Sequence, residues 1–160
     1  MIAGVHDADI WGLRFAADGT GLAVVDRHHG RLSLFCVEDG SFVRDVATGL
    51  ELPIDVEHCA EYGWAVSCWR TYAITFVGGI RDQATVGKQG KADGEFILPS
   101  ALAWVPGLGL VVREYCSSLQ FFATPDDIAM ASMSCAKTTW MATVARAMEK
   151  ISTVLVAVPK

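Results

Sequence analysis

The adjacent histidines His28 and His29 are the first residues whose type could support chemistry. Imidazole nitrogens bind transition metals and act as general acids or bases, and this pair stands in a predicted hairpin turn. Neighbouring side chains in a strand or tight turn point apart, and no third ligand stands at the spacing of a zinc site. We therefore expect no metal here and interpret the pair as part of a solvent-exposed turn.

A second candidate is His58-Cys59, because a histidine can activate a thiol as a nucleophile. Sequence neighbours in a strand face opposite sides, so the pattern favours a half-buried thiol. The chain also lacks a Gly-x-Ser-x-Gly elbow, a P-loop and a His-Glu-x-x-His pair. Its carboxylates could hold Ca²⁺ only if the fold gathered several of them on one rim. They are scattered, at Asp7, Asp9, Asp18, Asp55 and Glu57. No catalytic residue and no cofactor is predicted.

Composition narrows the class of protein. The chain has 160 residues, 52% of them hydrophobic, which is enough for one domain with a core. Its net charge of −5 argues against a broad phosphate-binding surface, so nucleic acid is a disfavoured partner. No run of roughly 18 apolar residues predicts a membrane span, and the N-terminus lacks the features of a secretory signal. Five widely spaced cysteines are typical of reduced thiols, and we expect a cytoplasmic protein.

Three stretches of the chain, 11–35, 54–77 and 100–122, follow the same order of elements. Each begins with alternating apolar residues, passes through a turn into a more continuous apolar run, and reaches a third run after a polar turn. The offsets between them are about 42 and about 46 residues, and fourth strands are expected at 41–47 and, more weakly, at 81–87. Four short strands in about 40 residues are typical of a β-propeller blade. A β-sandwich is the alternative.

The segment around Gly94, Phe96 and Pro99 resembles the NHL repeat, with a glycine-rich approach and a proline that opens the inner strand. The first stretch is similar to the other half of that repeat, at Asp26 and Arg31. We expect these two side chains to pair across their hairpin and stabilise the turn. The resemblance covers residues 10–123. It implies a mainly β fold, a partial β-propeller built of four-stranded antiparallel blades.

The predicted blades occupy residues 1–123, in units of about 11–53, 54–98 and 99–123. The later units have other residues at the position of Asp26. These are Ser67-Cys68-Trp69 in the second unit and Arg113-Glu114 in the third. Residues 124–160 are expected to form a C-terminal α-helix that ends near Lys150, followed at 151–158 by a strand or an apolar tail. Thr124 and Pro125 are typical of a helix start. Apolar residues continue at helical spacing, at Met133, Trp140, Val144, Met148 and Ile151.

This count gives just under three blades, whereas propellers close with about 4–8. Three explanations are open. The chain is part of a longer protein, it assembles with copies of itself, or the C-terminal helix covers an open face.

Aromatic and basic residues in the turns are candidates for binding a partner. Trp69 and Tyr72 flank the turn between the second and third strands of the second unit, with Arg70 between them. Exposed there, they would anchor a partner, whereas Trp64 and Trp104 stand at core positions of their strands. The predicted binding residues are Trp69, Arg70, Tyr72, Arg27, His28, His29 and Arg113.

Because the sequence contains no recognisable catalytic motif, it favours a non-catalytic interaction module that binds a protein partner or a second copy of itself. The resemblance implies a recognition domain of a larger protein, as in tripartite-motif ubiquitin ligases, although this chain contains no zinc-binding ligase domain. The alternative is a propeller enzyme, a lyase or lactonase-type hydrolase with a divalent metal on its rim. A third possibility is RNA binding, which a basic rim made of Arg27, Arg31, Arg70 and Arg113 would support.

Overall fold

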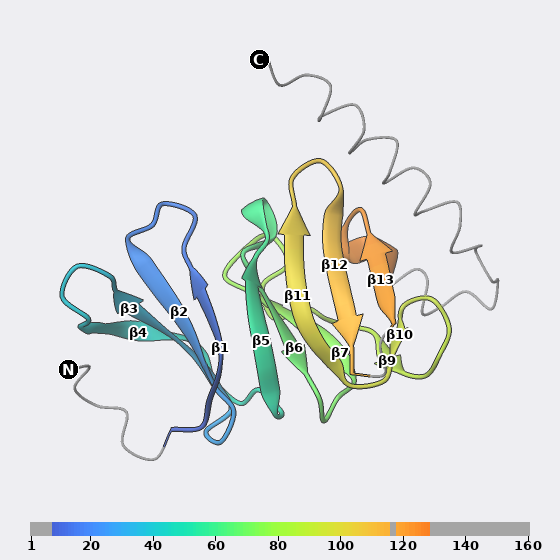
Figure 1. Cartoon of the computed structure of the whole chain (residues 1–160), viewed down its shortest axis with the longest axis horizontal. Coiled ribbons are helices and arrows are strands. Elements are labelled where there is room, and N and C mark those ends of the chain that lie inside the picture. The colour runs from blue at the N-terminus through green and yellow to red at the C-terminus, as the bar shows by residue number, and fades with distance from the viewer. Residues whose placement is uncertain (1–7, 116–117, 129–160) are drawn as a thin grey trace.

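The computed structural model describes residues 8–115 and 118–128 (Figure 1). Three antiparallel sheets follow one another along the chain, and the strands of each sheet pair in sequence order. The first sheet contains β1 (Ile10–Phe15), β2 (Gly21–Asp26), β3 (Arg31–Cys36) and β4 (Phe42–Ala47). The second contains β5 (Pro53–His58), β6 (Trp64–Cys68), β7 (Ala73–Val77) and β8 (Thr85–Val86). The third contains β11 (Pro99–Val105), β12 (Gly109–Glu114) and β13 (Leu119–Phe122).

Three smaller elements lie within and between these sheets. A single 3-10 turn, η1 (Ala60–Tyr62), joins β5 to β6. The short strands β9 (Lys88–Gln89) and β10 (Glu95–Phe96) pair in parallel between the second and third sheets. The predicted mainly β fold with four-stranded antiparallel sheets is thus present in the first two sheets. The third has three strands among the described residues, and none of the sheets described closes on itself.

The repeat predicted from the sequence is visible in the strand pairing. The last residue of the second strand pairs with the first residue of the first strand in every sheet, and a register shift follows in each case. These pairs are Asp26 with Ile10, Cys68 with Pro53, and Glu114 with Pro99. Asp26, Cys68 and Glu114 are 42 and 46 residues apart, as the sequence offsets predicted. The predicted fourth strand at 41–47 is β4, whereas that at 81–87 is reduced to the two residues of β8.

The first strands of the three sheets, β1, β5 and β11, lie side by side in the middle of the molecule (Figure 1). Gly12 permits the closest approach, because a Cβ at this position would lie 2.8 Å from Asp55 Cα. Arg14 reaches from β1 to both neighbours, donating to the carbonyls of Val56 (3.3 Å) and Leu102 (3.4 Å). Asp55 then accepts a hydrogen bond from the Leu102 backbone at 2.8 Å. Polar links therefore connect all three sheets along this line.

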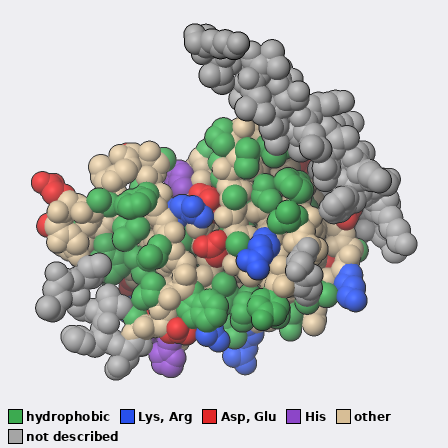
Figure 2. All heavy atoms as spheres, in the orientation of Figure 1, with side chains coloured by type: hydrophobic (Ala, Val, Ile, Leu, Met, Phe, Trp, Pro, Cys, Tyr) green, Lys and Arg blue, Asp and Glu red, His purple; other side chains and the backbone are tan. Residues whose placement is uncertain are grey.

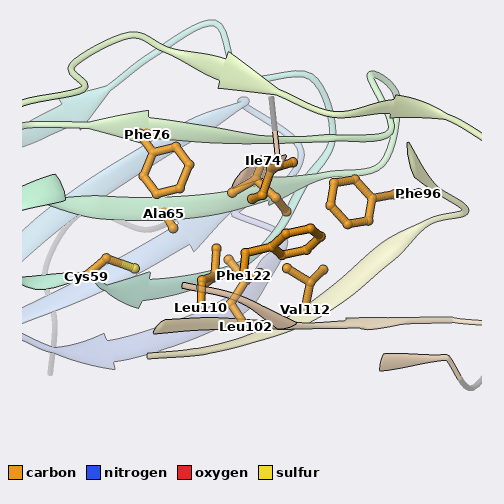
Figure 3. Packing of buried hydrophobic residues seen from close by; sticks show 10 residues of the cluster. Cys59, Ala65, Ile74, Phe76, Phe96, Leu102, Leu110, Val112 and Phe122 are labelled. Atoms are coloured by element: carbon orange, nitrogen blue, oxygen red, sulfur yellow. The ribbon is translucent and has the colours of Figure 1, made fainter. Parts of the chain in front are cut away.

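Two clusters of buried apolar side chains fill the spaces between the sheets. The cluster between the first and second sheets includes Val25, Leu32, Val56, Trp64 and Val66. The cluster between the second and third sheets includes Ile74, Phe76, Phe96, Leu110, Val112 and Phe122 (Figure 3). Each fully buried aliphatic or aromatic side chain contributes roughly 1.5–3 kcal/mol to folding. Trp64 lies in the first cluster and Trp104 packs against the second, as their strand positions predicted.

Helix begins where the sequence predicts it. Residues 125–128 are helical, and the Asp127 carboxylate accepts hydrogen bonds from the Thr124 backbone (2.8 Å) and hydroxyl (3.1 Å). Ile128 is fully buried in the cluster between the second and third sheets, so this first turn is anchored. The rest of the predicted helix and the tail at 151–158 lie outside the described residues. Within the described part of the chain, no helix has the length and hydrophobicity needed to cross a membrane.

Candidate binding surface

One residue from each sheet occupies the same place in the repeat and reaches the same end of the molecule. Each directly follows the second strand, and its backbone N–H donates to the carbonyl that precedes the first strand of the same sheet. The three bonds run from Arg27 to Asp9 (2.9 Å), from Trp69 to Leu52 (3.0 Å) and from Tyr115 to Leu98 (3.0 Å). Leu52 and Leu98 adopt φ of 51° and 56°, which a branched residue rarely does. The same backbone hydrogen bond therefore places all three side chains, and in the second and third sheets its acceptor has a strained backbone.

The side chains at these places meet one another. The Trp11 and Trp69 rings are 5.7 Å apart between centroids, and the Trp69 and Tyr115 rings 6.0 Å apart, both edge to face. The Arg27 guanidinium lies 4.7 Å from the Trp11 centroid and 6.0 Å from that of Trp69. Such geometries are favourable for aromatic pairs and for a cation over a ring. We call these four residues, Trp11, Arg27, Trp69 and Tyr115, the aromatic end patch.

Charges within the aromatic end patch are largely compensated. Asp9 accepts a hydrogen bond from Trp11 Nε1 at 2.8 Å and pairs with Arg27 at 3.2 Å. The rings stay accessible, since Trp11 is 47% exposed and Tyr115 65% exposed. At the lower end of the molecule, where these turns lie, hydrophobic, basic, acidic and histidine side chains gather (Figure 2). This surface therefore presents aromatic rings that contact one another, and its positive and negative charges largely cancel.

Two donors of the patch are unsatisfied. Arg27 Nε and Trp69 Nε1 are buried and have no hydrogen-bond partner among residues 8–115 and 118–128. A buried donor without an acceptor costs about 1–3 kcal/mol. Side-chain movement that exposed these donors to a bound acceptor would recover part of this cost.

The structure brings only some of the predicted binding residues together. Trp69 and Arg27 belong to the patch, whereas Arg70 is exposed beside it and pairs with Glu51 at 3.6 Å. Tyr72 is half-buried in the turn, at φ 54°, and Arg113 is exposed on β12. Trp11 and Tyr115 were not among the predicted binding residues. Aligning the ends of the second strands would have placed Tyr115 directly under Trp69.

His28 and His29 contact each other edge to face, with ring centroids 4.9 Å apart. Both are exposed, and His29 is held by Asp26, which accepts hydrogen bonds from its backbone (3.1 Å) and ring (2.8 Å). Arg31 donates to the same carboxylate at 3.1 Å, so Asp26 and Arg31 do pair across the hairpin. Burial alone raises the pKa of Asp26, but these hydrogen bonds from His29 and Arg31 outweigh it and hold the pKa below its ordinary value.

Glu114 takes the register position of Asp26 in the third sheet, where the sequence pattern suggested a departure from the repeat. It is 5% exposed and accepts hydrogen bonds from Ser118 Oγ (2.7 Å), Gln120 Nε2 (3.0 Å) and the Ile97 backbone. A buried, hydrogen-bonded carboxylate therefore occupies the same repeat position in the first and third sheets. Cys68 holds this position in the second sheet.

Three further residues that the sequence analysis assigned to the repeat, Phe96, Gly94 and Pro99, have structural roles. Phe96 is fully buried in the cluster between the second and third sheets. Gly94 adopts φ 75°, and its N–H donates to Gln120 Oε1 at 3.0 Å. Pro99 is buried and opens β11, where its missing N–H is tolerated.

No group of three or more His, Cys, Asp or Glu residues within 8–115 and 118–128 could hold a metal ion. The two buried thiols are poor nucleophiles. Burial raises the pKa of Cys59 to about 12, with a further rise from the charge of Glu57, and burial raises that of Cys68 to about 11. Both therefore stay protonated at neutral pH.

Three of the four arginines that could have formed a basic rim are paired with carboxylates. Arg27 pairs with Asp9, Arg31 with Asp26, and Arg70 with Glu51. These pairs reduce the positive field that phosphate binding requires.

No protein-family model matches the chain, and no curated protein is similar to it in sequence. Among solved structures, it is similar to Kuenenia stuttgartiensis hydrazine synthase with a TM-score of 0.53 and 15% identity, over 71% of this chain and 33% of that chain. It is also similar to the computationally designed Ika4 protein, with a TM-score of 0.46 and 10% identity, over 76% of this chain and 94% of that chain. The chain spans only a third of the first of these proteins, and at such identities the likeness concerns the fold alone.

Proposed function

We propose that the three sheets are consecutive blades of a β-propeller-type repeat, and that the chain is a non-catalytic module that binds a protein partner through the aromatic end patch. One observation carries the proposal: Arg27, Trp69 and Tyr115 are equivalent residues of three successive repeats, and their side chains form a single contact surface with Trp11. Packing between the sheets does not by itself require aromatic side chains to be exposed together at one end of the molecule.

The chemistry of the patch fits a protein partner better than a nucleic acid. Tryptophan, tyrosine and arginine are the residue types that most often dominate binding energy in protein interfaces. The charge of Arg27 is compensated by Asp9, and the chain carries a net charge of −5. A peptide carbonyl could also satisfy the unpartnered donors, Arg27 Nε and Trp69 Nε1, once the rings shift.

The repeat itself is proposed to be of the NHL type, on the roles of Gly94, Phe96 and Pro99 described above. In this proposal the module is a cytoplasmic recognition element that presents its turns to the partner.

Selection of a displayed library of random peptides on the chain tests the proposal. We expect the enriched peptides to compete with one another and to lose at least tenfold in affinity when Trp11 and Tyr115 are both replaced by alanine. Loss of two hot-spot rings typically costs about 2 kcal/mol or more, and both residues are exposed enough that the fold should tolerate the change.

The matched control is Ile80→Ala, which removes an apolar side chain that is 69% exposed and stands outside the patch. It should leave peptide affinity unchanged. Peptides that bind the Trp11→Ala/Tyr115→Ala variant as tightly as the natural sequence would overturn the proposal.

A further inference from the structure

One face of the first sheet carries exposed apolar side chains around Val24 and Phe35, which are themselves 7% and 6% exposed. Leu13 and Phe15 of β1, together with Phe42 of β4, are 54%, 60% and 52% exposed. Cross-strand pairing places all three on one face, because Leu13 pairs with Val24, and Phe15, Leu22, Phe35 and Phe42 pair in a row across the sheet. Phe35 and Phe42 are in edge-to-face contact, with centroids 5.7 Å apart. Figure 2 shows hydrophobic side chains at the surface over this sheet. We call this face the open face.

The corresponding face of each later sheet is buried against the sheet before it. Leu22 and Val24 of the open face correspond, at the repeat offset of 42, to Trp64 and Val66, which are buried between the first and second sheets. At the next offset of 46 they correspond to Leu110 and Val112, which are buried between the second and third sheets. The open face is therefore equivalent to the faces on which the second and third sheets pack against the sheet before them.

The outward face of the third sheet corresponds to the faces of the first and second sheets that pack against the sheet after them. Ala23 and Ala65 are fully buried on the faces that cover the following sheet, and Val111 is their equivalent on β12. Residues on this outward face remain accessible: Leu119 is 43% exposed, and Ala103 and Arg113 are exposed. Arg113 has a charge opposite to that of Asp45, which is exposed on the open face and accepts a hydrogen bond from Ser33.

We propose that a second copy of this chain occupies the open face, seated by the outward face of its third sheet. The contact continues the packing that already joins the first sheet to the second and the second to the third. Two such head-to-tail contacts would close two chains into a ring of six sheets, within the range of about 4–8 that propellers adopt. The proposal rests on the propeller-type repeat proposed above, but the aromatic end patch has no part in it.

The experiment measures solution mass by light scattering for the natural sequence, Phe15→Asp, Leu119→Asp and an equimolar mixture of the two variants. We expect a two-chain mass for the natural sequence and a single-chain mass for each variant alone. The mixture should recover the two-chain mass in part, because Phe15→Asp keeps an intact outward face and Leu119→Asp keeps an intact open face. Circular dichroism of each variant checks that the fold is retained, and Ile80→Asp, which changes an exposed residue elsewhere, should keep the two-chain mass.

A single-chain mass for the natural sequence at every concentration would overturn the proposal and leave the open face to another segment or protein. A two-chain mass that Phe15→Asp abolishes and Leu119→Asp preserves would also overturn it, since two open faces would then pack on each other. The Trp11→Ala/Tyr115→Ala variant should keep the two-chain mass. Failure of the patch to bind peptides is therefore distinguishable from failure of the chains to associate.

Discussion

At the scale of single residues, a buried carboxylate stands next to two members of the aromatic end patch, Arg27 and Tyr115. Asp26 is 2% exposed and accepts hydrogen bonds from His29 and Arg31. Glu114 is 5% exposed and accepts hydrogen bonds from Ser118, Gln120 and the Ile97 backbone. Because a buried charge is tolerated only when it is paired and hydrogen-bonded, these carboxylates fix the backbone next to them through their partners. The side chains of Arg27 and Tyr115, next to them in sequence, are positioned as a result.

Replacing Asp26 with asparagine should lower the free energy of unfolding by about 1–3 kcal/mol at neutral pH, since Arg31 and the His29 ring lose a charged acceptor. The folded pKa of Asp26 is depressed, so its contribution is present above the unfolded pKa and is lost as pH falls through the folded value. The difference between variant and natural sequence should therefore shrink below about pH 4. Urea unfolding across this pH range measures it.

Asp55→Asn is a control for which we expect the opposite dependence of stability on pH. Burial raises the pKa of Asp55, although hydrogen bonds from the Leu102 and Val56 backbones and the charge of Arg14 partly oppose the rise. The stability that Asp55 contributes is present below its unfolded pKa and is lost as pH rises through the folded value. Relative to the natural sequence, Asp55→Asn should thus gain stability as pH rises. The same pH trend in both variants would contradict this account of the two sites.

At the scale of elements, the two faces of each sheet have different neighbours. Alternation along β2 sends Ala23 and Val25 toward the second sheet and Leu22 toward the open face. β4 is exposed along most of its length, which is the pattern of an edge strand. Stability should therefore depend on the residues between sheets and very little on the residues of β4.

Two valine-to-alanine changes test this dependence. Val56→Ala, at a fully buried position of β5, should lower the free energy of unfolding by about 2 kcal/mol through lost burial and a residual cavity. Val43→Ala, at a 52% exposed position of β4, should change it by less than about 0.5 kcal/mol. Chemical denaturation of both variants gives the comparison. Equal losses would mean that the space between the first and second sheets is not the core we describe.

At the scale of the whole molecule, polar groups on the first strands join sheets whose apolar clusters are separate. Arg14 of the first sheet contacts both of the others and pairs with Glu57 at 3.2 Å. Asp55 of the second sheet binds the Leu102 backbone of the third. These links lie along the line of β1, β5 and β11, where the three sheets approach most closely (Figure 1).

Arg14→Met should lower the free energy of unfolding by about 1–2 kcal/mol, because two backbone carbonyls and Glu57 lose a charged donor at once. The Arg14 side chain is 40% exposed, and solvent screening keeps the effect at this modest size. Arg81→Met is the matched control, since Arg81 pairs only at the surface, with Asp126, and its loss should cost less than about 0.5 kcal/mol. Thermal unfolding of the two variants measures the difference, and a larger loss for Arg81→Met would contradict the role given to Arg14.

Local residues alone determined much of the fold. Alternation, turn residues and the offsets of 42 and 46 predicted the strands and their repeat, because strand formation and turn type depend on nearby side chains. The Asp26–Arg31 pair and the helix start at Thr124 were predictable for the same reason, since each involves residues within a single turn.

Tertiary structure decided which distant turns come together. Trp11, Arg27, Trp69 and Tyr115 span more than a hundred positions in sequence, and their contacts depend on how the three sheets stack. The offsets placed Glu114 at the position of Asp26, but its hydrogen bonds to Ser118, Gln120 and Ile97 depend on how β11 to β13 pair and were not predictable from residue type. Local patterns therefore specified the strands of each sheet, whereas the order in which the sheets stack decided which side chains form the aromatic end patch and which face of the first sheet stays exposed.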